Sequence, residues 1–365
     1  MNRRNMLRGG AIATAATATL AAPALAQPAM PEVRWRLTSG FPRPLDALYG
    51  VAEMIGRVVG QMTDGRFRIQ TFPAGEIVPS PGAFEATQNG SVEASHVPNY
   101  WFFGRQAALA FETGIPFGLT QRQQNAWVFQ GGGLDLIHEV LKPFNMISFP
   151  AGNTGCQMGG FFRKEIRSTD DLKGLKFRIA GLGGTVLQRL GAVPQQLPPG
   201  DIYPALERGT IDAAEFVGPY DDERLGLIRV APFYYFPGFW EPGSQLSLNV
   251  NLEAWNKLPD HYKAIVQAAA AQANVELMAR YDAWNAQAIR RLVAAGAQLR
   301  PFSREIMAAA WTESHKLYDE LAANNAVFKK VYDNWRPFRD QQFQWARVAD
   351  NTFENFAFTA SQTVR

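Results

Sequence analysis

Arg178 is the residue of this sequence that is best suited to bind a small anion. It lies in a mostly apolar, strand-like run at 176–179 that leads into a glycine turn at 181–184. A guanidinium is costly to bury unless an anion meets it, and its rigid fork of donors matches a carboxylate with two parallel hydrogen bonds. Arg178 therefore either binds the carboxylate of a ligand or lies on the solvated face of an alternating strand.

Three further polar residues stand at the ends of predicted strands or in turns. Gln157 precedes one predicted strand, Glu215 ends another, and Glu241 lies in the aromatic turn 239–243. Glutamate is seldom buried without a partner, so glutamates among aromatic residues are unusual. Each of these residues alone is typical of a solvated turn, whereas together with Arg178 they favour a shared binding site.

The elements that must position these residues alternate between strands and helices. Strands are expected at 33–37, 66–72, 92–97, 145–149, 159–162, 176–179 and 244–250, and helices at 45–61, 79–89 and 185–190. This alternation is typical of an α/β fold with largely parallel sheets.

A short internal repeat suggests two similar lobes. The segment 84–95 recurs at 205–214, each time as a helix end, a glycine and a strand that starts apolar–acidic–Ala. The residues after the two strands, Asn99 and Tyr100 in one copy and Glu215 and Phe216 in the other, would then be equivalent. Ligands bind beyond the carboxyl ends of strands in such sheets, so we expect both segments to border one cleft.

The mature chain is long enough for two lobes with crossings between them. We assign 27–150 and about 240–275 to the first lobe, and 151–239 and about 276–335 to the second. The run from Pro259 to Gly296 predicts a helix of roughly 55 Å that crosses both lobes.

The chain beyond residue 303 is predicted to be helical, with a break near Pro337. The last helix, 336–365, continues an aromatic stripe that either packs on the core or docks on a second subunit.

Residues 1–26 read as a twin-arginine signal peptide, with Arg3-Arg4, an apolar run and Ala24-Leu25-Ala26 before the cleavage site. The mature protein is therefore expected in the periplasm.

Without the signal the basic and acidic residues balance at 33 each, since 36 minus its three arginines leaves 33. That balance argues against nucleic-acid partners. The single cysteine, Cys156, excludes an internal disulfide and is expected to be a small buried residue.

No familiar catalytic motif occurs in the sequence. It lacks the serine-hydrolase elbow, the phosphate-binding loop and the paired histidine or cysteine motifs, and its four histidines are scattered. The glycine turn at 181–184 departs from the dinucleotide-binding spacing at its third glycine.

Several segments together resemble a known family. The exported N-terminus, the run DDLKGLKFR at 170–178, the run ERGTIDAA at 207–214 and the helix at 259–295 resemble the periplasmic solute receptors of TRAP transporters. Gln157, Glu215-Phe216 and Trp240-Glu241 look most like the branch of that family that binds 2-oxo acids together with a cation.

The resemblance implies a two-lobed, non-catalytic periplasmic receptor that closes on a pyruvate-like monocarboxylate and passes it to TRAP membrane permease subunits. Arg178 would bind the carboxylate, and Gln157 would touch both ligand and cation. Glu215, the Phe216 carbonyl and Glu241 would hold the cation, for which the family favours sodium and the charge sum favours calcium. Asn99 and Tyr100 would contact the ligand on closure, an expectation that rests on the internal repeat. Apart from the resemblance, a homodimer through the C-terminal helix follows from the second of the two interpretations of its aromatic stripe.

Two other functions compete with this one. A secreted hydrolase or lyase could use Glu215 and Glu241 as acid and base around Arg178, which requires a protonated glutamate with a raised pKa. An assembly protein that dimerises through its aromatic tail would bind no ligand.

Overall fold

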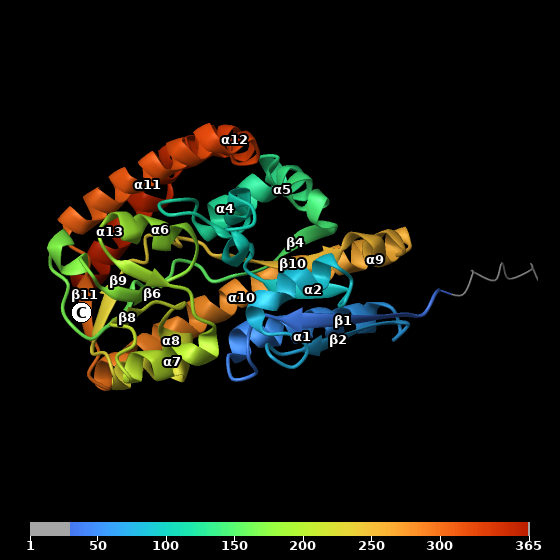
Figure 1. Ribbon diagram of the computed structural model, residues 1–365, viewed down its shortest axis with the longest axis horizontal. Coiled ribbons are helices and arrows are strands. Elements are labelled where there is room, and N and C mark those ends of the chain that lie inside the picture. The colour runs from blue at the N-terminus through green and yellow to red at the C-terminus, as the bar shows by residue number, and fades with distance from the viewer. Residues whose placement is uncertain (1–29, 364–365) are drawn as a thin grey trace, which may run out of the picture.

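The structure is a computed structural model that describes residues 30–363, so the predicted signal peptide at 1–26 lies outside the described residues. The chain forms two sheets, each flanked by helices (Figure 1). The first has the strand order β2-β1-β3-β10-β4 and the second β11-β9-β5-β8-β6-β7. The strands are β1 Val33–Ser39, β2 Phe67–Phe72, β3 Ala94–Val97, β4 Met146–Asn153, β5 Gly160–Phe162, β6 Lys176–Arg178, β7 Val193–Gln195, β8 Ala213–Ala214, β9 Phe233–Phe236, β10 Gln245–Asn251 and β11 Gln298–Pro301.

Helices connect and cover these strands. They are α1 Asp46–Met62, α2 Ala83–Gln88, α3 Ala110–Thr113, α4 Gln121–Gln130, α5 Gly133–Leu141, α6 Gly181–Arg189, α7 Pro199–Glu207, α8 Pro219–Leu225, α9 Leu252–Asn256, α10 Asp260–Ala294, α11 Arg304–Asn324, α12 Ala326–Val348 and α13 Asp350–Thr363. Short 3-10 turns add η1 Ser80–Gly82, η2 Asn99–Phe102, η3 Ala107–Leu109, η4 Lys142–Phe144, η5 Thr169–Leu172 and η6 Leu227–Arg229. The predicted two-lobed α/β fold is confirmed.

Strand β10 carries the chain back from the second sheet into the first. It lies between β3 and β4 and pairs antiparallel with both, whereas β1 pairs parallel with β2 and β3. The predicted return of the strand at 244–250 to the first lobe is therefore confirmed.

Helix α10 is the predicted spine. Its 35 residues correspond to about 52 Å. It packs on α1 and β4 beside the first sheet and on α8 beside the second, and Figure 1 shows it passing along both. A buried stripe that includes Val266, Leu277, Tyr281 and Leu292 runs along its length and faces both lobes.

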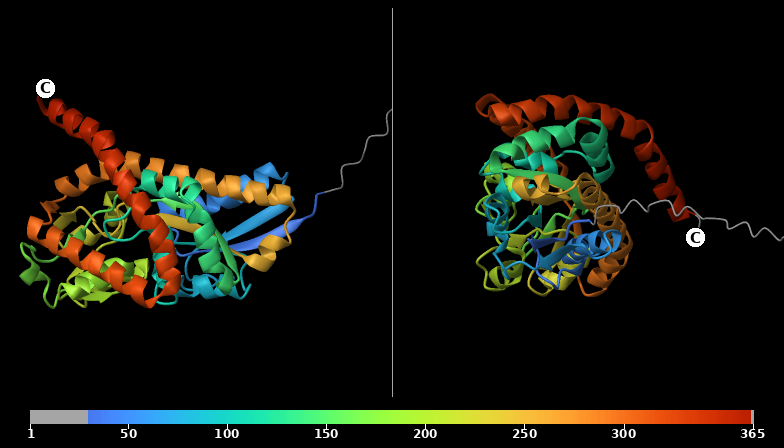
Figure 2. Two further views of the ribbon diagram at one scale, coloured as in Figure 1. Left: turned by 90° about the horizontal axis from the view of Figure 1, so that it is seen from above. Right: turned by 90° about the vertical axis from the view of Figure 1, so that its right-hand side faces the viewer.

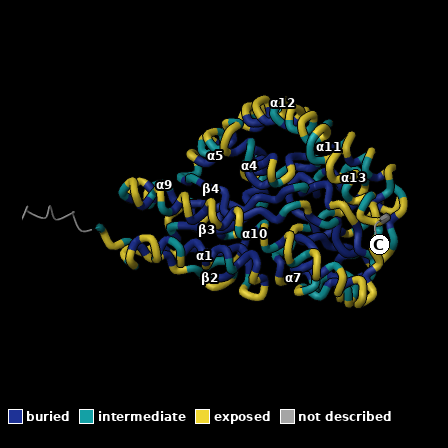
Figure 3. The backbone as a smooth tube through the Cα atoms, turned by 180° about the vertical axis from the view of Figure 1, so that it is seen from behind, coloured by how far each residue is buried: buried dark blue, intermediate teal, exposed yellow. Residues whose placement is uncertain are grey.

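The two lobes share their apolar cores. One buried cluster joins Leu37 of β1 to Phe161 and Tyr234 of the second sheet, and another joins Phe84 and Trp127 to residues of the second sheet such as Phe177. Figure 3 shows the buried strands between helices whose outer faces are exposed. Because both clusters cross between the sheets, the lobe boundaries at about 150, 240 and 276 stay a prediction.

The internal repeat corresponds to equivalent turns. Helices α2 and α7 are each followed by a glycine in the left-handed region, Gly90 with φ 76° and Gly209 with φ 73°. The strands that follow, β3 and β8, lie in different sheets. β8 is only two residues long, shorter than the repeat suggested.

The expected helix break near Pro337 is wrong. α12 continues through Pro337, and the breaks fall at Asn325 and Ala349. Tertiary packing outweighs the local cost of proline, because Trp335 is buried against Phe111 with ring centroids 5.5 Å apart. The aromatic stripe therefore divides: its first part packs on the core, whereas Trp345, Phe353 and Phe356 have exposed fractions of 57%, 72% and 75%. Figure 2 shows α13 projecting from the body.

Two further expectations concern exposure. Cys156 is exposed, which corrects the expected buried position, because it lies in the irregular segment between β4 and β5. Within residues 30–363, none of the helices combines the length and the apolar character needed to cross a membrane.

Candidate functional site

The segments that follow strands of the two sheets meet where the lobes join. Turn η2, which follows β3 of the first sheet, packs against α6, which follows β6 of the second. The Tyr100 ring lies where a side chain on Gly181 would have to stand, and Gly181 has a left-handed φ of 64°. A glycine is required there, because any Cβ would overlap the ring and strain the backbone.

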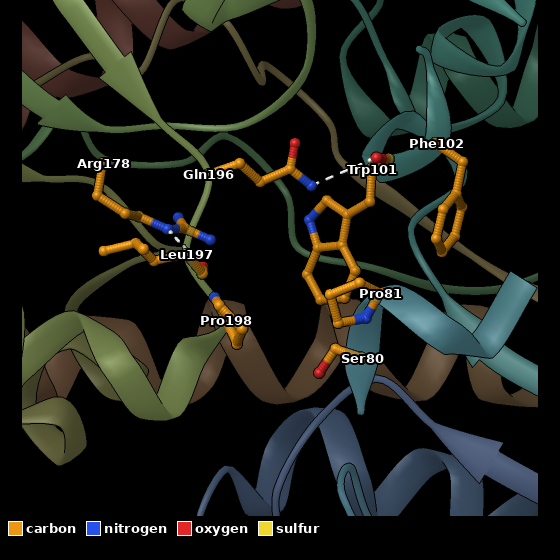
Figure 4. Close-up of a pocket in the computed structure, with 8 residues that line it drawn as sticks. All are labelled: Ser80, Pro81, Trp101, Phe102, Arg178, Gln196, Leu197 and Pro198. Carbon is orange, nitrogen blue, oxygen red and sulfur yellow. Dashed lines mark hydrogen bonds between the residues drawn. The ribbon is translucent and has the colours of Figure 1, made fainter. Parts of the chain in front are cut away.

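A pocket opens between the lobes beside this contact (Figure 4). Its lining comes from both sides: Ser80, Pro81, Trp101 and Phe102 from the first lobe, and Arg178, Gln196, Leu197 and Pro198 from the second. Gln196 reaches across and donates from Nε2 to the Trp101 carbonyl at 3.3 Å. The pocket is thus bordered by both lobes, and Arg178 is the charged residue in its lining.

Arg178 is only 2% exposed, so it does not lie on a solvated strand face. Its Nη1 donates to the Glu215 carboxylate and to the Glu215 carbonyl, each at 2.6 Å, and its Nε donates to the Leu197 carbonyl at 3.3 Å. Among the described residues Nη2 has no hydrogen-bond partner. This nitrogen is therefore available to a ligand in the pocket.

Several buried oxygens around Arg178 lack a hydrogen-bond donor. They are Gln157 Oε1, Glu215 Oε2 and both carboxylate oxygens of Glu241. The Gln157 backbone donates to the Glu241 carbonyl at 3.1 Å, which joins these segments. Buried acceptors without donors are costly, so this arrangement calls for protons or a cation.

Burial dominates the electrostatics of both glutamates. It raises the pKa of Glu215 well above its ordinary value, although the Arg178 charge lowers it and Glu241 raises it further. Burial also raises the pKa of Glu241. Ser244, Tyr100, Arg178 and Gln157 oppose that rise by favouring the ionised form, although neither Glu241 oxygen makes a hydrogen bond of ordinary geometry.

The available ligands suit a hard cation. Gln157, Glu215 and Glu241 offer side-chain oxygens, and within residues 30–363 the Phe216 carbonyl accepts no hydrogen bond. Oxygen ligands of this kind fit sodium or calcium and not a transition metal. The described part of the chain holds no cluster of three or more His, Cys, Asp or Glu able to bind a metal ion, in keeping with a set built from two carboxylates, an amide and a carbonyl.

Asn99 and Tyr100 differ in their surroundings. The Asn99 amide donates to Glu112 and to Asn249 Oδ1 and accepts from Asn249 Nδ2 at 2.7 Å, so its polar atoms are used within the first lobe. Tyr100 is buried next to Glu241, and its backbone amide donates to Thr113 at 3.1 Å. The structure therefore gathers Gln157, Arg178, Glu215, Glu241 and Tyr100, while the Asn99 side chain points into its own lobe.

Sequence reasoning missed some of the residues near the site. The segment Gln196–Pro198 follows β7, the neighbour of β6, so the rule about strand ends would have found it. Gln245 is fully buried with neither amide atom paired, and it begins the strand that returns to the first lobe. Gln245 could have been noticed in the sequence as a polar residue in a strand that was predicted to be buried.

Comparison with known proteins gives consistent relatives. The model of the family described as "Bacterial extracellular solute-binding protein, family 7" matches residues 39–325. A monocarboxylate 2-oxoacid-binding periplasmic protein from Nostoc sp. is 51% identical over 361 residues, covering 98% of this chain and 99% of the relative.

Solved structures agree with this result. A TRAP transporter solute-binding protein from Bordetella bronchiseptica is 48% identical with a TM-score of 0.91, covering 92% of this chain and 100% of that one. It is described as a dimer of mixed occupancy with copurified calcium and picolinate. A TRAP periplasmic solute-binding protein from Pseudoalteromonas atlantica, with bound sodium and pyruvate, is 34% identical with a TM-score of 0.86 and covers 89% of this chain and 99% of that one.

Proposed function

Because the chain belongs to family 7 of the bacterial extracellular solute-binding proteins, the periplasmic receptors of TRAP transporters, we propose that its interlobe site binds a pyruvate-like 2-oxo monocarboxylate together with a metal cation. The protein is a receptor and not an enzyme, which sets aside the acid–base hydrolase or lyase considered above. The Nostoc relative supports the ligand class, and the two solved relatives support the cation.

The observation that carries this proposal is the set of buried, unpartnered oxygens beside Arg178. With Arg178, Glu215, Glu241 and the ligand carboxylate ionised, one positive charge faces three negative ones, a net of two negative charges. Like charges a few ångströms apart repel by several kcal/mol when the effective dielectric constant is near 20. A bound cation relieves that repulsion and supplies the partners that the oxygens lack.

We assign the roles as follows. Arg178 binds the ligand carboxylate through the nitrogen that Glu215 leaves free, and Gln157 contacts both ligand and cation. Glu215, the Phe216 carbonyl and Glu241 complete the cation site. Tyr100 contacts the ligand when the lobes are closed. Asn99 does not reach the ligand with its side chain, since its amide is held by Asn249 and Glu112. It fixes the start of η2 and thereby positions Tyr100.

Sodium is the cation we propose. If all four groups are ionised, calcium neutralises the site and sodium leaves one negative charge. Burial raises the pKa of Glu215 and of Glu241, so the site favours retention of one proton, in which case sodium alone neutralises it. Calcium is the competing cation, since the solved relatives hold one or the other.

The proposal is tested by titrating the protein with pyruvate after chelation and exhaustive dialysis. Calorimetry is carried out with no added metal, with NaCl, with CaCl2, and with choline chloride as a control for ionic strength. Tight binding is expected with a metal salt and not with choline chloride. Full affinity in the absence of any metal would contradict the proposal, and turnover of the acid would revive the enzyme hypothesis.

Two partners are part of this proposal. We propose that the closed receptor docks on TRAP membrane permease subunits. We also propose that α13 forms a homodimer by packing on a second copy of the chain. The exposed side chains of Phe353, Phe356 and Phe358 support this, as does the dimeric state of the Bordetella relative.

A further inference from the structure

The peptide bond between Phe216 and Val217 is held through its N–H, which belongs to Val217 and points away from the Phe216 carbonyl. The Val217 amide donates to Asp222 Oδ1 at 3.4 Å, and the Val217 carbonyl accepts from the Met158 amide at 3.0 Å. A trans peptide is planar, so its N–H and C=O point in opposite directions. Holding the Val217 N–H therefore sets the direction in which the Phe216 carbonyl points.

The rest of this segment is equally restrained. The Glu215 amide donates to the Arg178 carbonyl at 3.1 Å, and the Glu215 carbonyl accepts from Arg178 Nη1. Among the described residues, only the Phe216 carbonyl of the three in this segment accepts no hydrogen bond. The free carbonyl is thus a consequence of how its neighbours are held.

Asp222 is itself held firmly. It is fully buried, and its second oxygen, Oδ2, accepts a hydrogen bond of 2.6 Å from the Tyr234 hydroxyl. Tyr234 stacks on Phe161 with ring centroids 4.0 Å apart, so the hydroxyl has little freedom to move. The chain of contacts runs from the second sheet through Tyr234 and Asp222 to the Phe216–Val217 peptide.

We infer that Asp222 is a positioning residue of the cation site: it orients the Phe216 carbonyl through the Val217 amide. This inference rests on the proposed function, because it takes the Phe216 carbonyl as a cation ligand. Partners of this kind, which orient a ligand without touching the metal, typically change metal affinity 10- to 100-fold when they are replaced.

Asp221 provides a matched control within the same helix. Both aspartates are fully buried, and each accepts a hydrogen bond from a tyrosine hydroxyl, Asp222 from Tyr234 and Asp221 from Tyr281 of α10. Only Asp222 contacts the peptide at Val217. A loss of stability that comes from removing any buried carboxylate of α8 should therefore appear in both Asp→Leu variants. A loss of cation affinity should appear in Asp222→Leu alone.

The experiment compares the wild type with Asp222→Leu, Asp221→Leu and Tyr234→Phe; leucine has a similar size and no acceptor for the Val217 amide. Each protein is stripped of metal and titrated with NaCl and, separately, with CaCl2 at saturating pyruvate by calorimetry, and the unfolding temperature of the metal-free protein is measured in parallel. We expect Asp222→Leu to lower cation affinity about 10- to 100-fold. Tyr234→Phe keeps the stacked ring and should lower it about 3- to 10-fold, because one hydrogen bond to the carboxylate is lost. Asp221→Leu should leave cation affinity within about twofold of the wild type.

The outcomes distinguish failure of the proposed cation site from failure of the role assigned to Asp222. A wild type that binds neither calcium nor sodium overturns the proposed cation site itself. A wild type that binds a cation while Asp222→Leu binds it equally well overturns only the role of Asp222. Equal losses of affinity in both aspartate variants also overturn it, because they would indicate a general effect of disturbing α8. If Asp222→Leu does not fold, the comparison of Tyr234→Phe with the wild type decides the matter.

Discussion

Arg178 donates from Nη1 to both the carboxylate and the backbone carbonyl of Glu215, each at 2.6 Å. Both side chains are buried, so this pair holds the guanidinium in one orientation before any ligand arrives. The other terminal nitrogen stays free beside the interlobe pocket. A preoriented donor loses less conformational entropy when it binds a carboxylate.

The first prediction concerns this donor. Arg178→Lys keeps the charge but loses the free Nη2 donor and the contacts with Glu215 that orient the side chain, so pyruvate affinity should fall about 10- to 100-fold. Arg189→Lys serves as the control, since Arg189 pairs with Glu320 away from the pocket. Calorimetry of the two variants at saturating cation checks this, and an unchanged affinity in Arg178→Lys would remove Arg178 from the ligand site.

Glu241→Gln should weaken cation binding. The change removes one negative charge and one of the two unpartnered carboxylate oxygens, so we expect sodium or calcium affinity to fall about tenfold or more. Pyruvate affinity should fall in parallel at low salt and recover at high cation concentration. The exposed Glu253, replaced in the same way, should change neither affinity. Cation-independent pyruvate binding in Glu241→Gln would mean that the two ligands do not share a site.

Closure of the lobes can be tested at Gly181. Alanine there must adopt a left-handed φ of 64° and would overlap the Tyr100 ring, whereas Gly174 has a φ of 74° and open space where a Cβ would stand. The left-handed backbone should cost each variant about 1–2 kcal/mol of unfolding free energy, and the overlap with Tyr100 adds to that cost in Gly181→Ala. Only Gly181→Ala should also weaken pyruvate binding, by about tenfold or more, because it separates η2 from α6. Equal affinities in the two variants would show that this contact does not contribute to binding.

His96 should make stability dependent on pH. It is fully buried, and burial lowers its pKa to about 4, although its hydrogen bond to the Ala151 carbonyl opposes the shift. The unfolded chain takes up the proton near pH 6.5 and the folded chain does not until about pH 4. The stability contributed by neutral His96 is thus present above pH 6.5 and is lost as the pH falls toward 4.

Between pH 7 and pH 5 this group should reduce the free energy of unfolding by about 2 kcal/mol. Urea unfolding of the wild type, His96→Gln and the control His261→Gln, whose histidine is exposed, measures the effect. The slope of stability against pH should flatten in His96→Gln alone. An identical slope in all three proteins would mean that a group other than His96 causes the pH dependence of stability.

Removal of residues 349–365 should convert the proposed dimer into a monomer. Helix α13 makes contacts with α12 but leaves Phe353 and Phe356 about three-quarters exposed, so its deletion opens little of the core. Sedimentation velocity checks the oligomeric state, and pyruvate affinity of the shortened chain should match that of the full one. A shortened chain that still sediments as a dimer would move the interface elsewhere.

The sequence predicted the repetitive parts of the fold well, for physical reasons. Alternating and helical patterns report which side of an element is buried, so α1, α10 and β10 were predicted within a few residues. Pro337 misled the prediction because its local cost is known from sequence, whereas the compensating burial of Trp335 depends on distant segments.

The same limit applies to the site. Arg178 and Glu215 stood out as costly residues in apolar surroundings, but nothing in their spacing indicated that they pair with each other. Asp222 drew no attention because an acidic residue near the start of a short helix is ordinary on a surface. Its importance arises from burial against Tyr234, a residue brought there by the packing of β9.

The position of β10 between β3 and β4 has a consequence for the order in which the chain can fold. During synthesis the first 153 residues emerge with β3 and β4 lacking the strand that joins them, and that strand arrives only at residues 245–251. Domains of many proteins fold one after another as they leave the ribosome. Here the sheet of the first lobe stays incomplete until residues 245–251 have been made, so the first lobe cannot complete its native structure before most of the second lobe has been synthesised.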